Sequence, residues 1–589
     1  MIGCAPIPLL ALLAGVVASP ISCSKPEAFA AVQPPAGVAA QHGLPQDPVP
    51  AAPTQPTRVA RPKLVVLFSI DQLATWVFDE CKPHFAKDGG FQRLLDSGVH
   101  FGECAFAHAC TETGPGHATI GTGVPALVHG IVKNEWYDRD LKAKVYCSGD
   151  ANAAALAPFP EGKGRSAARM LVPTVGDLLQ TADARAKVVA VAHKDRSAIL
   201  MAGNKADVVV WCETSTGRFV TNATWGNAPQ WLLDFDAKKP MDAFFGWTWD
   251  RIGPASAYDG LVDDRAFEAP HATTKARTLP AVIRGGGDAV RPAFYTEAFV
   301  SPISNEAVLQ CAIAALRGEQ LGKDEFADLL CVSFSALDTV GHYFGPDSVE
   351  ARDTLLRIDL LLASFFAVLD EHVGAGMWAI ALTADHGVGL PPEVAKERGL
   401  GGGRGLLHTQ CKAAAEQALR REFGVEGGAP FVAHAGEWSL VLDRARIAEA
   451  RGERSADEAF RRACEVAAMA CSRAPGIERG YARHEVEGRT ADDNLQIRSL
   501  AFAAHERAGD VLIVAKPYWL EPSLPASHGT PHDYDRRVPL LAMGPMLQRG
   551  VVCADACTPG LAAVYAAWWL GLETPAASID ALPQSAMAK

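Results

Sequence analysis

Three apolar, strand-like runs of this chain each lead to an aspartate: KLVVLFSI precedes Asp71, LLCVSFSAL precedes Asp338, and MWAIALTA precedes Asp385. Helical patterns separate these runs. Such alternation predicts an α/β fold with a largely parallel central sheet and helices on both faces. Because ligands of an open α/β sheet bind at the carboxyl ends of its strands, three carboxylates there predict a cation site. Two of them bring a histidine, since His342 follows Asp338 and His386 follows Asp385.

Later in the chain, WSLVLD at 438–443 and DVLIVA at 510–515 continue the strand pattern, with a helical segment between them. They are expected to extend the same alternation. The stretch from about 198 to 300 interrupts the rhythm, because tryptophans occur there among loop-forming Gly, Pro and Asp. It is therefore predicted to be an insertion that covers the site as a cap. The simpler interpretation of its tryptophans is that they form a small core within this insertion.

Composition excludes some classes of protein. The chain has 589 residues, of which 49% are hydrophobic and 21% charged, so most of it is globular rather than disordered. The formal net charge of −12 includes no long basic run, which argues against nucleic acid or an anionic membrane as the main partner. The 14 cysteines show no zinc-finger spacing. Cys553 with Cys557, or Cys464 with Cys471, are possible bridges in an oxidising compartment, and counts do not fix the pairing.

The first residues indicate the compartment. The apolar run Leu9–Ala18 is shorter than the roughly 20 residues that cross a bilayer, and an Ala-x-Ala site follows it at Ala28–Ala30. Residues 1–30 are therefore predicted to be a signal peptide, with no transmembrane segment and a periplasmic or secreted location. Cys23 offers a lipid anchor as the alternative. Residues 31–62, rich in Ala, Pro and Gln, predict a linker before a catalytic domain at 63–589.

The candidate nucleophile lies in TETGPGHATI at 111–120. Thr113 is followed by Gly-Pro and a helix-compatible run, so it is expected at a helix N-cap with Pro115 in the first turn. Free backbone N–H groups at such a terminus attract an anion. A threonine hydroxyl is a poor nucleophile unless a metal activates it. Seen alone, Thr113 is explained as a cap; beside three strand-end aspartates it becomes a catalytic candidate.

With these motifs the sequence resembles the alkaline phosphatase superfamily, specifically its periplasmic, phosphate-irrepressible monoesterases with a threonine nucleophile. The resemblance runs in the family's order across most of the chain. The matching segments are IDQ at 70–72, TGPGHATIGTG at 113–123, HGIVKNEWYD at 129–138, KDRSAI at 194–199, ALDTVGHYFGPDS at 336–348, TADHG at 383–387 and SHGTPHDYD at 527–535.

The resemblance implies two metal ions and a covalent intermediate on Thr113. One zinc ion would be held by Asp71, Asp385 and His386 together with the Thr113 oxygen, and the other by Asp338, His342 and His528. Nitrogen and oxygen ligands without thiolate fit catalytic zinc sites, but they also accept Mn²⁺ or Co²⁺, so zinc is what the resemblance implies. His532 lies one helical turn from His528 and is an alternative ligand; the family pattern favours His528 and leaves the role of His532 open.

Specificity is expected in the groups that hold the phosphate oxygens. Lys194 and Arg196 follow the VVAVA run and would point the same way if that strand extended through them. Two cations stabilise a monoester dianion more than a diester. The resemblance implies that this pair marks monoesterases, with Asn134 as a neutral donor.

The sequence therefore predicts a two-metal phosphomonoesterase that acts on small phosphate monoesters through a phosphothreonine. A phosphodiesterase or nucleotide pyrophosphatase with the same metals and threonine is the alternative. A metal-binding relative without turnover is a second one.

Overall fold

The computed structural model describes residues 61–436 and 438–588. The predicted signal peptide, the possible lipid anchor at Cys23 and nearly all of the predicted linker lie outside these residues. Among the described residues, no single helix is long and apolar enough to cross a membrane, although the bent pair α8 (Pro292–Phe299) and α9 (Ile303–Gly318) meets the length and composition criteria together.

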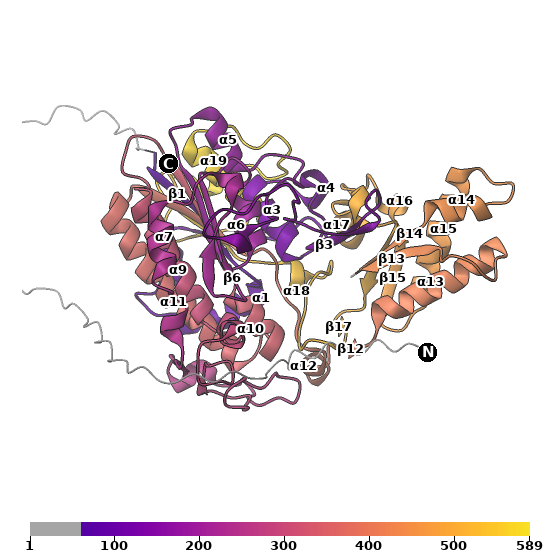
Figure 1. Ribbon diagram of the computed structural model, residues 1–589, viewed down its shortest axis with the longest axis horizontal. Helices are drawn as coiled ribbons and strands as arrows, with labels where there is room; N and C mark the ends of the chain where they lie inside the picture. The colour runs from indigo at the N-terminus through magenta and orange to yellow at the C-terminus, as the bar shows by residue number, and fades with distance from the viewer. Residues whose placement is uncertain (1–60, 437, 589) are drawn as a thin grey trace, which may run out of the picture. The chain divides into compact units, whose positions relative to one another are not determined.

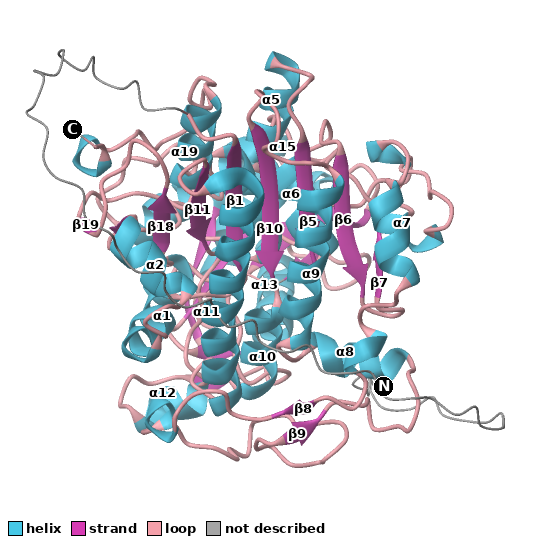
Figure 2. Ribbon diagram, turned by 90° about the vertical axis from the view of Figure 1, so that its left-hand side faces the viewer, coloured by secondary structure: helices cyan, strands magenta, loops and turns pink. Residues whose placement is uncertain are grey.

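A nine-stranded sheet with the order β19-β2-β18-β11-β1-β10-β5-β6-β7 forms the centre of the described chain (Figure 2). The strands β11, β1, β10, β5 and β6 run parallel, and β18, β2 and β7 add antiparallel pairs at the two sides. The predicted α/β fold with a largely parallel sheet is confirmed. The strands are β1 (Leu64–Ile70), β2 (Val99–Phe101), β5 (Val188–Ala192), β6 (Val208–Glu213), β7 (Arg218–Val220), β10 (Asp328–Phe334), β11 (Trp378–Thr383), β18 (Leu540–Met543) and β19 (Val551–Cys553).

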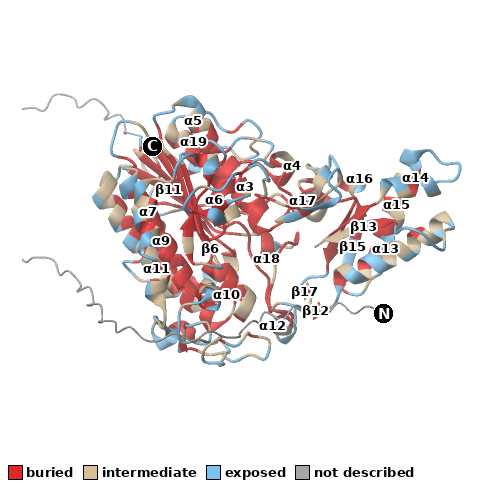
Figure 3. Ribbon diagram, in the orientation of Figure 1, coloured by how far each residue is buried: buried red, intermediate tan, exposed pale blue. Residues whose placement is uncertain are grey.

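Helices cover both faces of this sheet, which explains why its central strands are continuous apolar runs. Every residue of β1, β5, β10 and β11 is buried, and Figure 3 shows the buried residues concentrated in the sheet and in the helix faces toward it. Figure 1 shows α9 and α11 on one side of the sheet and α3 and α6 on the other. The bounds of these helices are α3 (Thr113–Thr122), α6 (Asp195–Ala202) and α11 (Val349–Leu369).

The two later strands form, but they do not join the central sheet. β14 (Ser439–Leu442) and β16 (Val511–Ala515) belong to a separate four-stranded sheet of order β13-β14-β16-β15, with β13 at Val432–Gly436 and β15 at Ile477–Ala482. All its pairings are antiparallel. The helices α13 (Leu407–Phe423) and α15 (Ala456–Cys471) share a core with it. The expectation that these strands continue the parallel alternation is wrong, because strand spacing does not determine the direction of pairing.

Residues 198–300, expected to be an insertion, begin within the central fold, since β6 and β7 are strands of the nine-stranded sheet. Beyond β7 the chain forms only short elements, among them α7 (Gln230–Ala237), β8 (Thr248–Trp249) and β9 (Ala281–Val282). The tryptophans of this region pack onto the main core rather than forming a separate one. Trp249 is fully buried, and its Nε1 donates to Asp353 Oδ2 of α11 at 2.7 Å.

Candidate metal centre

Three adjacent strands bring the three aspartates together. β1 pairs in parallel with β10 on one side and β11 on the other, so their carboxyl ends meet at one edge of the sheet. Asp71 directly follows β1, and Asp385 follows β11 after one intervening residue. Asp338 does not end its strand, because β10 stops at Phe334; it lies in the first turn of α10 (Ala336–Phe344). The carboxylates nevertheless converge as an open α/β sheet predicts.

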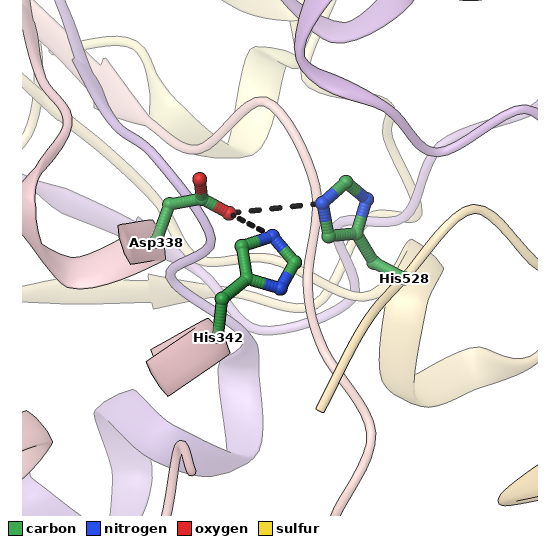
Figure 4. Close-up of side chains that lie close together, drawn as sticks. All are labelled: Asp338, His342 and His528. Carbon is green, nitrogen blue, oxygen red and sulfur yellow. Dashed lines mark ion pairs between the residues drawn. The ribbon is translucent and has the colours of Figure 1, made fainter. Parts of the chain in front are cut away.

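One group of candidate ligands is Asp338, His342 and His528, whose ligand atoms lie within 4.8 Å of one another. His342 Nε2 is 3.1 Å from Asp338 Oδ1, and His528 Nε2 is 3.6 Å from the same oxygen (Figure 4). The Nδ1 atoms of the two histidines lie 2.8 Å from the carbonyl oxygen of Ala526 and 2.7 Å from that of Thr111. A carbonyl only accepts, so Nδ1 donates and each Nε2 is left with a lone pair for a metal.

The second group is Asp71, Asp338 and His386, which also lie within 4.8 Å of one another. His386 Nε2 is 3.4 Å from both Asp71 Oδ1 and Asp385 Oδ2. These three atoms are buried and have no hydrogen-bond partner among the described residues. Buried polar atoms without partners are costly, and imidazole with carboxylate is the donor set of catalytic divalent sites. The buried Asp/His cluster therefore fits a metal ion.

Electrostatics at this edge of the sheet also favour a cation. Burial, then the charges of Asp338 and Asp385, raise the pKa of Asp71. Burial lowers the pKa of His528 well below its usual value, with His386 adding to the effect, so this ring stays neutral. Lys194 supplies positive charge, because its ammonium donates to Asp71 Oδ2 at 2.5 Å and to Asp338 Oδ2 at 2.6 Å.

Lys194 and Arg196 reach the site by a different route from the one expected. Strand β5 ends at Ala192, so it does not extend through them; Lys194 is the N-cap residue of α6 and Arg196 lies in its first turn. The strand-based argument is wrong because the chain turns into a helix at once. The side chains still converge, since Arg196 Nη2 donates to Thr113 Oγ1 at 3.3 Å.

Thr113 opens α3 as its first helical residue and is buried. The N-cap is Glu112, so the expected capping position of Thr113 is off by one residue, and the hydroxyl faces Arg196 instead. The next residue, Gly114, donates its backbone N–H to Asn134 Oδ1 at 2.7 Å. Glu112 in turn accepts the backbone N–H of Asn134 at 2.8 Å. Asn134 is thereby fixed at the N-terminus of this helix.

Two residues that sequence reasoning gave no role also contact the cluster. Gln72 donates its backbone N–H to Asp385 Oδ1 at 3.1 Å and its Nε2 to Asp338 Oδ1 at 2.7 Å. His117 lies one turn after Thr113 on α3, with Nδ1 3.2 Å from Asp385 Oδ2. Both stand in matched segments, IDQ and TGPGH, but only the folded backbone shows where they point.

His532 does not join either group. Its Nε2 lies 2.9 Å from the Ala515 carbonyl oxygen, and its ring packs 5.2 Å from that of Tyr534. Of the two histidines in this segment, His528 is the one that lies beside Asp338.

Known proteins resemble this chain in sequence and in fold. A family model described as type I phosphodiesterase / nucleotide pyrophosphatase matches residues 65–521. The chain is 30% identical over 503 residues to alkaline phosphatase PafA of Elizabethkingia meningoseptica, covering 84% of this chain and 88% of that protein. It is 30% identical over 495 residues to alkaline phosphatase PhoV of Synechococcus elongatus, covering 83% and 86%. The crystal structure of wild-type PafA matches with a TM-score of 0.80 at 26% identity, covering 90% of this chain and 100% of that one.

Proposed function

This chain belongs to the alkaline phosphatase superfamily, in the branch of PafA-like alkaline phosphatases, and we propose that it is a phosphomonoesterase that acts through a phosphothreonine at Thr113. Metal-dependent hydrolysis of phosphate esters follows from the family. The observation that supports the finer proposal is the contact of Arg196 Nη2 with Thr113 Oγ1 at 3.3 Å. A fixed guanidinium beside the attacking oxygen matches the extra negative charge of a monoester.

In this proposal the cluster would hold two zinc ions. Asp71, Asp385 and His386 would hold one together with the Thr113 oxygen. Asp338, His342 and His528 would hold the other. When bound, the metal pair would lower the pKa of the threonine hydroxyl and neutralise the leaving alkoxide.

The chain's own groups carry out the rest of the mechanism. Thr113 Oγ1 attacks phosphorus in line, so the Oγ1–P bond forms as the bond from phosphorus to the leaving oxygen breaks; water then hydrolyses the phosphothreonine. Arg196 and Lys194 bind the non-bridging phosphate oxygens. Asn134 Oδ1 is occupied by the Gly114 N–H, so its Nδ2 is the group that donates to phosphate. Gln72 holds Asp385 in place through its backbone N–H.

The covalent step is tested by acid quench during turnover of p-nitrophenyl phosphate, followed by peptide mass spectrometry. We expect phosphate at position 113 in the wild type and in Thr113→Ser, but not in Thr113→Ala. Thr113→Ala should also lose turnover while retaining its thermal midpoint. Steady turnover by Thr113→Ala would contradict the proposal.

The description of the matching family model favours one other candidate, a phosphodiesterase or nucleotide pyrophosphatase. It would use the same metals and threonine. The two are separated by kcat/KM for p-nitrophenyl phosphate and for its bis ester. We expect the monoester to be preferred in the wild type, and that preference to fall in Arg196→Ala. A wild type that prefers the bis ester would establish the alternative.

We also propose that the enzyme works in the periplasm or outside the cell. The support is the predicted signal peptide at residues 1–30. Cell fractionation with an N-terminal sequence of the mature protein tests it, and a cytoplasmic protein that keeps residues 1–30 would contradict it.

A further inference from the structure

Asp195 lies in sequence between Lys194 and Arg196, the two proposed phosphate-binding cations. Each of its two carboxylate oxygens accepts two hydrogen bonds. Its Oδ1 accepts the Tyr146 hydroxyl at 2.6 Å and the backbone N–H of Arg196 at 2.7 Å. Its Oδ2 accepts Arg165 Nε at 2.6 Å and the Ser148 hydroxyl at 3.3 Å. A carboxylate that accepts four hydrogen bonds from separate segments of the chain is held in one position.

Tyr146 connects this fixed point to the nucleophile. Arg196 Nη1 donates to the Tyr146 oxygen at 3.2 Å, while Nη2 of the same guanidinium donates to Thr113 Oγ1. Burial raises the pKa of Tyr146, so its phenol stays protonated and its O–H donates onward to Asp195. The Arg165 guanidinium carbon lies over the Tyr146 ring, 5.0 Å from its centroid. A continuous chain of hydrogen bonds thus runs from Asp195 through Tyr146 and Arg196 to Thr113.

The hairpin that follows Asn134 delivers this tyrosine. Tyr146 ends β4 (Ala143–Tyr146) and pairs with Glu135, the first residue of β3 (Glu135–Asp138). One hairpin therefore places both Asn134 and the tyrosine that holds Arg196. Asp195 comes from the start of α6, so two separate elements fix the guanidinium.

The Arg196 side chain needs the hydrogen bond to Tyr146 because it lies beside a cavity. A cavity of about 230 Å³ is lined by Tyr146, Arg165, Lys194, Asp195 and Arg196, among others. Arg196 Nε has no hydrogen-bond partner among the described residues, so the side chain is held through Nη1 and Nη2 alone. Without the bond to Tyr146, the long side chain gains rotamers directed into the cavity. A displacement of about 1 Å at a reacting centre costs on the order of 100-fold in rate.

We propose that Tyr146 and Asp195 are positioning residues that set the preference for monoesters by holding the Arg196 guanidinium beside Thr113. This inference rests on the proposed function, because it assigns Arg196 to the phosphate dianion. Neither Tyr146 nor Asp195 needs to touch the substrate.

The test compares Tyr146→Phe and Asp195→Asn with the wild type on p-nitrophenyl phosphate and its bis ester. Both variants keep the side-chain shape. We expect kcat/KM for the monoester to fall about 10-fold to 100-fold, and that for the bis ester to change by less than about 3-fold, because a diester lacks the second charge that Arg196 faces. The inhibition constant of inorganic phosphate should rise in the same variants in which kcat/KM for the monoester falls.

Tyr137→Phe is the matched control. Tyr137 lies on β3 of the same hairpin, but its ring stacks on His434 at 5.3 Å instead of entering the chain of hydrogen bonds. This variant should keep the wild-type ratio of monoester to diester activity. A double variant Tyr146→Phe/Arg196→Ala should lose no more monoester activity than Arg196→Ala alone, because the two residues act as one unit.

The outcomes separate this inference from the proposed function. An equal loss on both esters in Tyr146→Phe and Asp195→Asn would mean a structural role and overturn the inference. Unchanged ratios in both variants, with a lowered ratio in Arg196→Ala, would also overturn it while leaving the proposed function standing. An unchanged ratio in Arg196→Ala itself would overturn the monoesterase assignment. Thermal midpoints identify a variant that fails to fold, and the other variant then decides.

Discussion

Gly116 of α3 lies directly against the backbone of Asp385. A Cβ atom added at Gly116 would stand 1.9 Å from the Asp385 carbonyl oxygen and 2.5 Å from its carbonyl carbon. Because Thr113 opens the same helix, this contact sets how closely the hydroxyl approaches the aspartate cluster. The second glycine of TGPGH is thus required by close packing between a helix and a strand end.

Gly116→Ala should therefore push α3 away from the cluster. We expect kcat/KM for p-nitrophenyl phosphate to fall at least about 100-fold, and the free energy of unfolding to fall by about 1–3 kcal/mol. Gly102→Ala is the control, since its added Cβ would meet only Val552 Cγ1, at 3.9 Å. Kinetics and denaturant unfolding measure both effects. Full activity in Gly116→Ala would show that the contact does not position Thr113.

His528 and His532 form a natural pair for testing the metal assignment. His528→Ala should lose one of the two proposed zinc ions and nearly all turnover. His532→Ala should keep its metal and lose about 1 kcal/mol of stability, because it gives up the hydrogen bond to the Ala515 carbonyl and the ring contact with Tyr534 but no proposed metal ligand. Mass spectrometry of metal content measures the difference. Equal metal loss in the two variants would refute the assignment.

Removal of metal should abolish activity, and zinc should restore it. The protein should remain folded during this treatment, because the Lys194 ammonium contacts both Asp71 and Asp338. In Lys194→Met these buried carboxylates lose that cation, so chelation should lower the free energy of unfolding by about 3 kcal/mol more than in the wild type. Thermal unfolding with and without chelator measures this. The same loss in both proteins would mean that Lys194 does not stabilise the carboxylates.

Stability should also depend on pH through a residue outside the metal centre. Glu268 is 3% exposed, and burial raises its pKa from 4.5 to about 8. Because the folded-state pKa is the higher one, its contribution to stability is complete below about pH 4.5 and is lost as the pH rises through 8.

The free energy of unfolding should thus fall between pH 5 and pH 8, and less so in Glu268→Gln, whose side chain stays neutral. Denaturant unfolding at the two pH values measures the slope. An identical slope in the variant would remove Glu268 as its source.

The sequence predicted the parts of the site that local pattern determines. Asp71 and Asp385 follow the ends of uninterrupted apolar strands, so their place at the sheet edge could be inferred from hydrophobic runs alone. Asp338 could be assigned to the site, but the end of the strand before it could not be placed, because the apolar pattern continues from β10 into α10 without a break. The end of β5 before Lys194 and Arg196 could not be predicted for the same reason, because the chain turns directly into α6.

The rest depends on contacts between distant segments. Tyr146 is an ordinary hairpin residue until the fold brings it to Arg196, and no spacing in the sequence indicates that meeting. The four-stranded sheet is a similar case, since β14 and β16 look like any other strands and only their partners make them antiparallel. Hydrophobic periodicity reports which residues are buried, whereas pairing is decided by the whole chain.

The placement of β1 between β10 and β11 has a consequence for synthesis. A ribosome releases the threonine and the first aspartate early, whereas the neighbours that complete the pocket emerge only after most of the polypeptide has been made. If Thr113 is the nucleophile as proposed, a nascent or C-terminally shortened form has its hydroxyl without the proposed metal ligands, and we expect that form to be inactive. The proposed set of ligands is complete only once His528 has been synthesised and its segment has folded against Asp338 and His342 of α10.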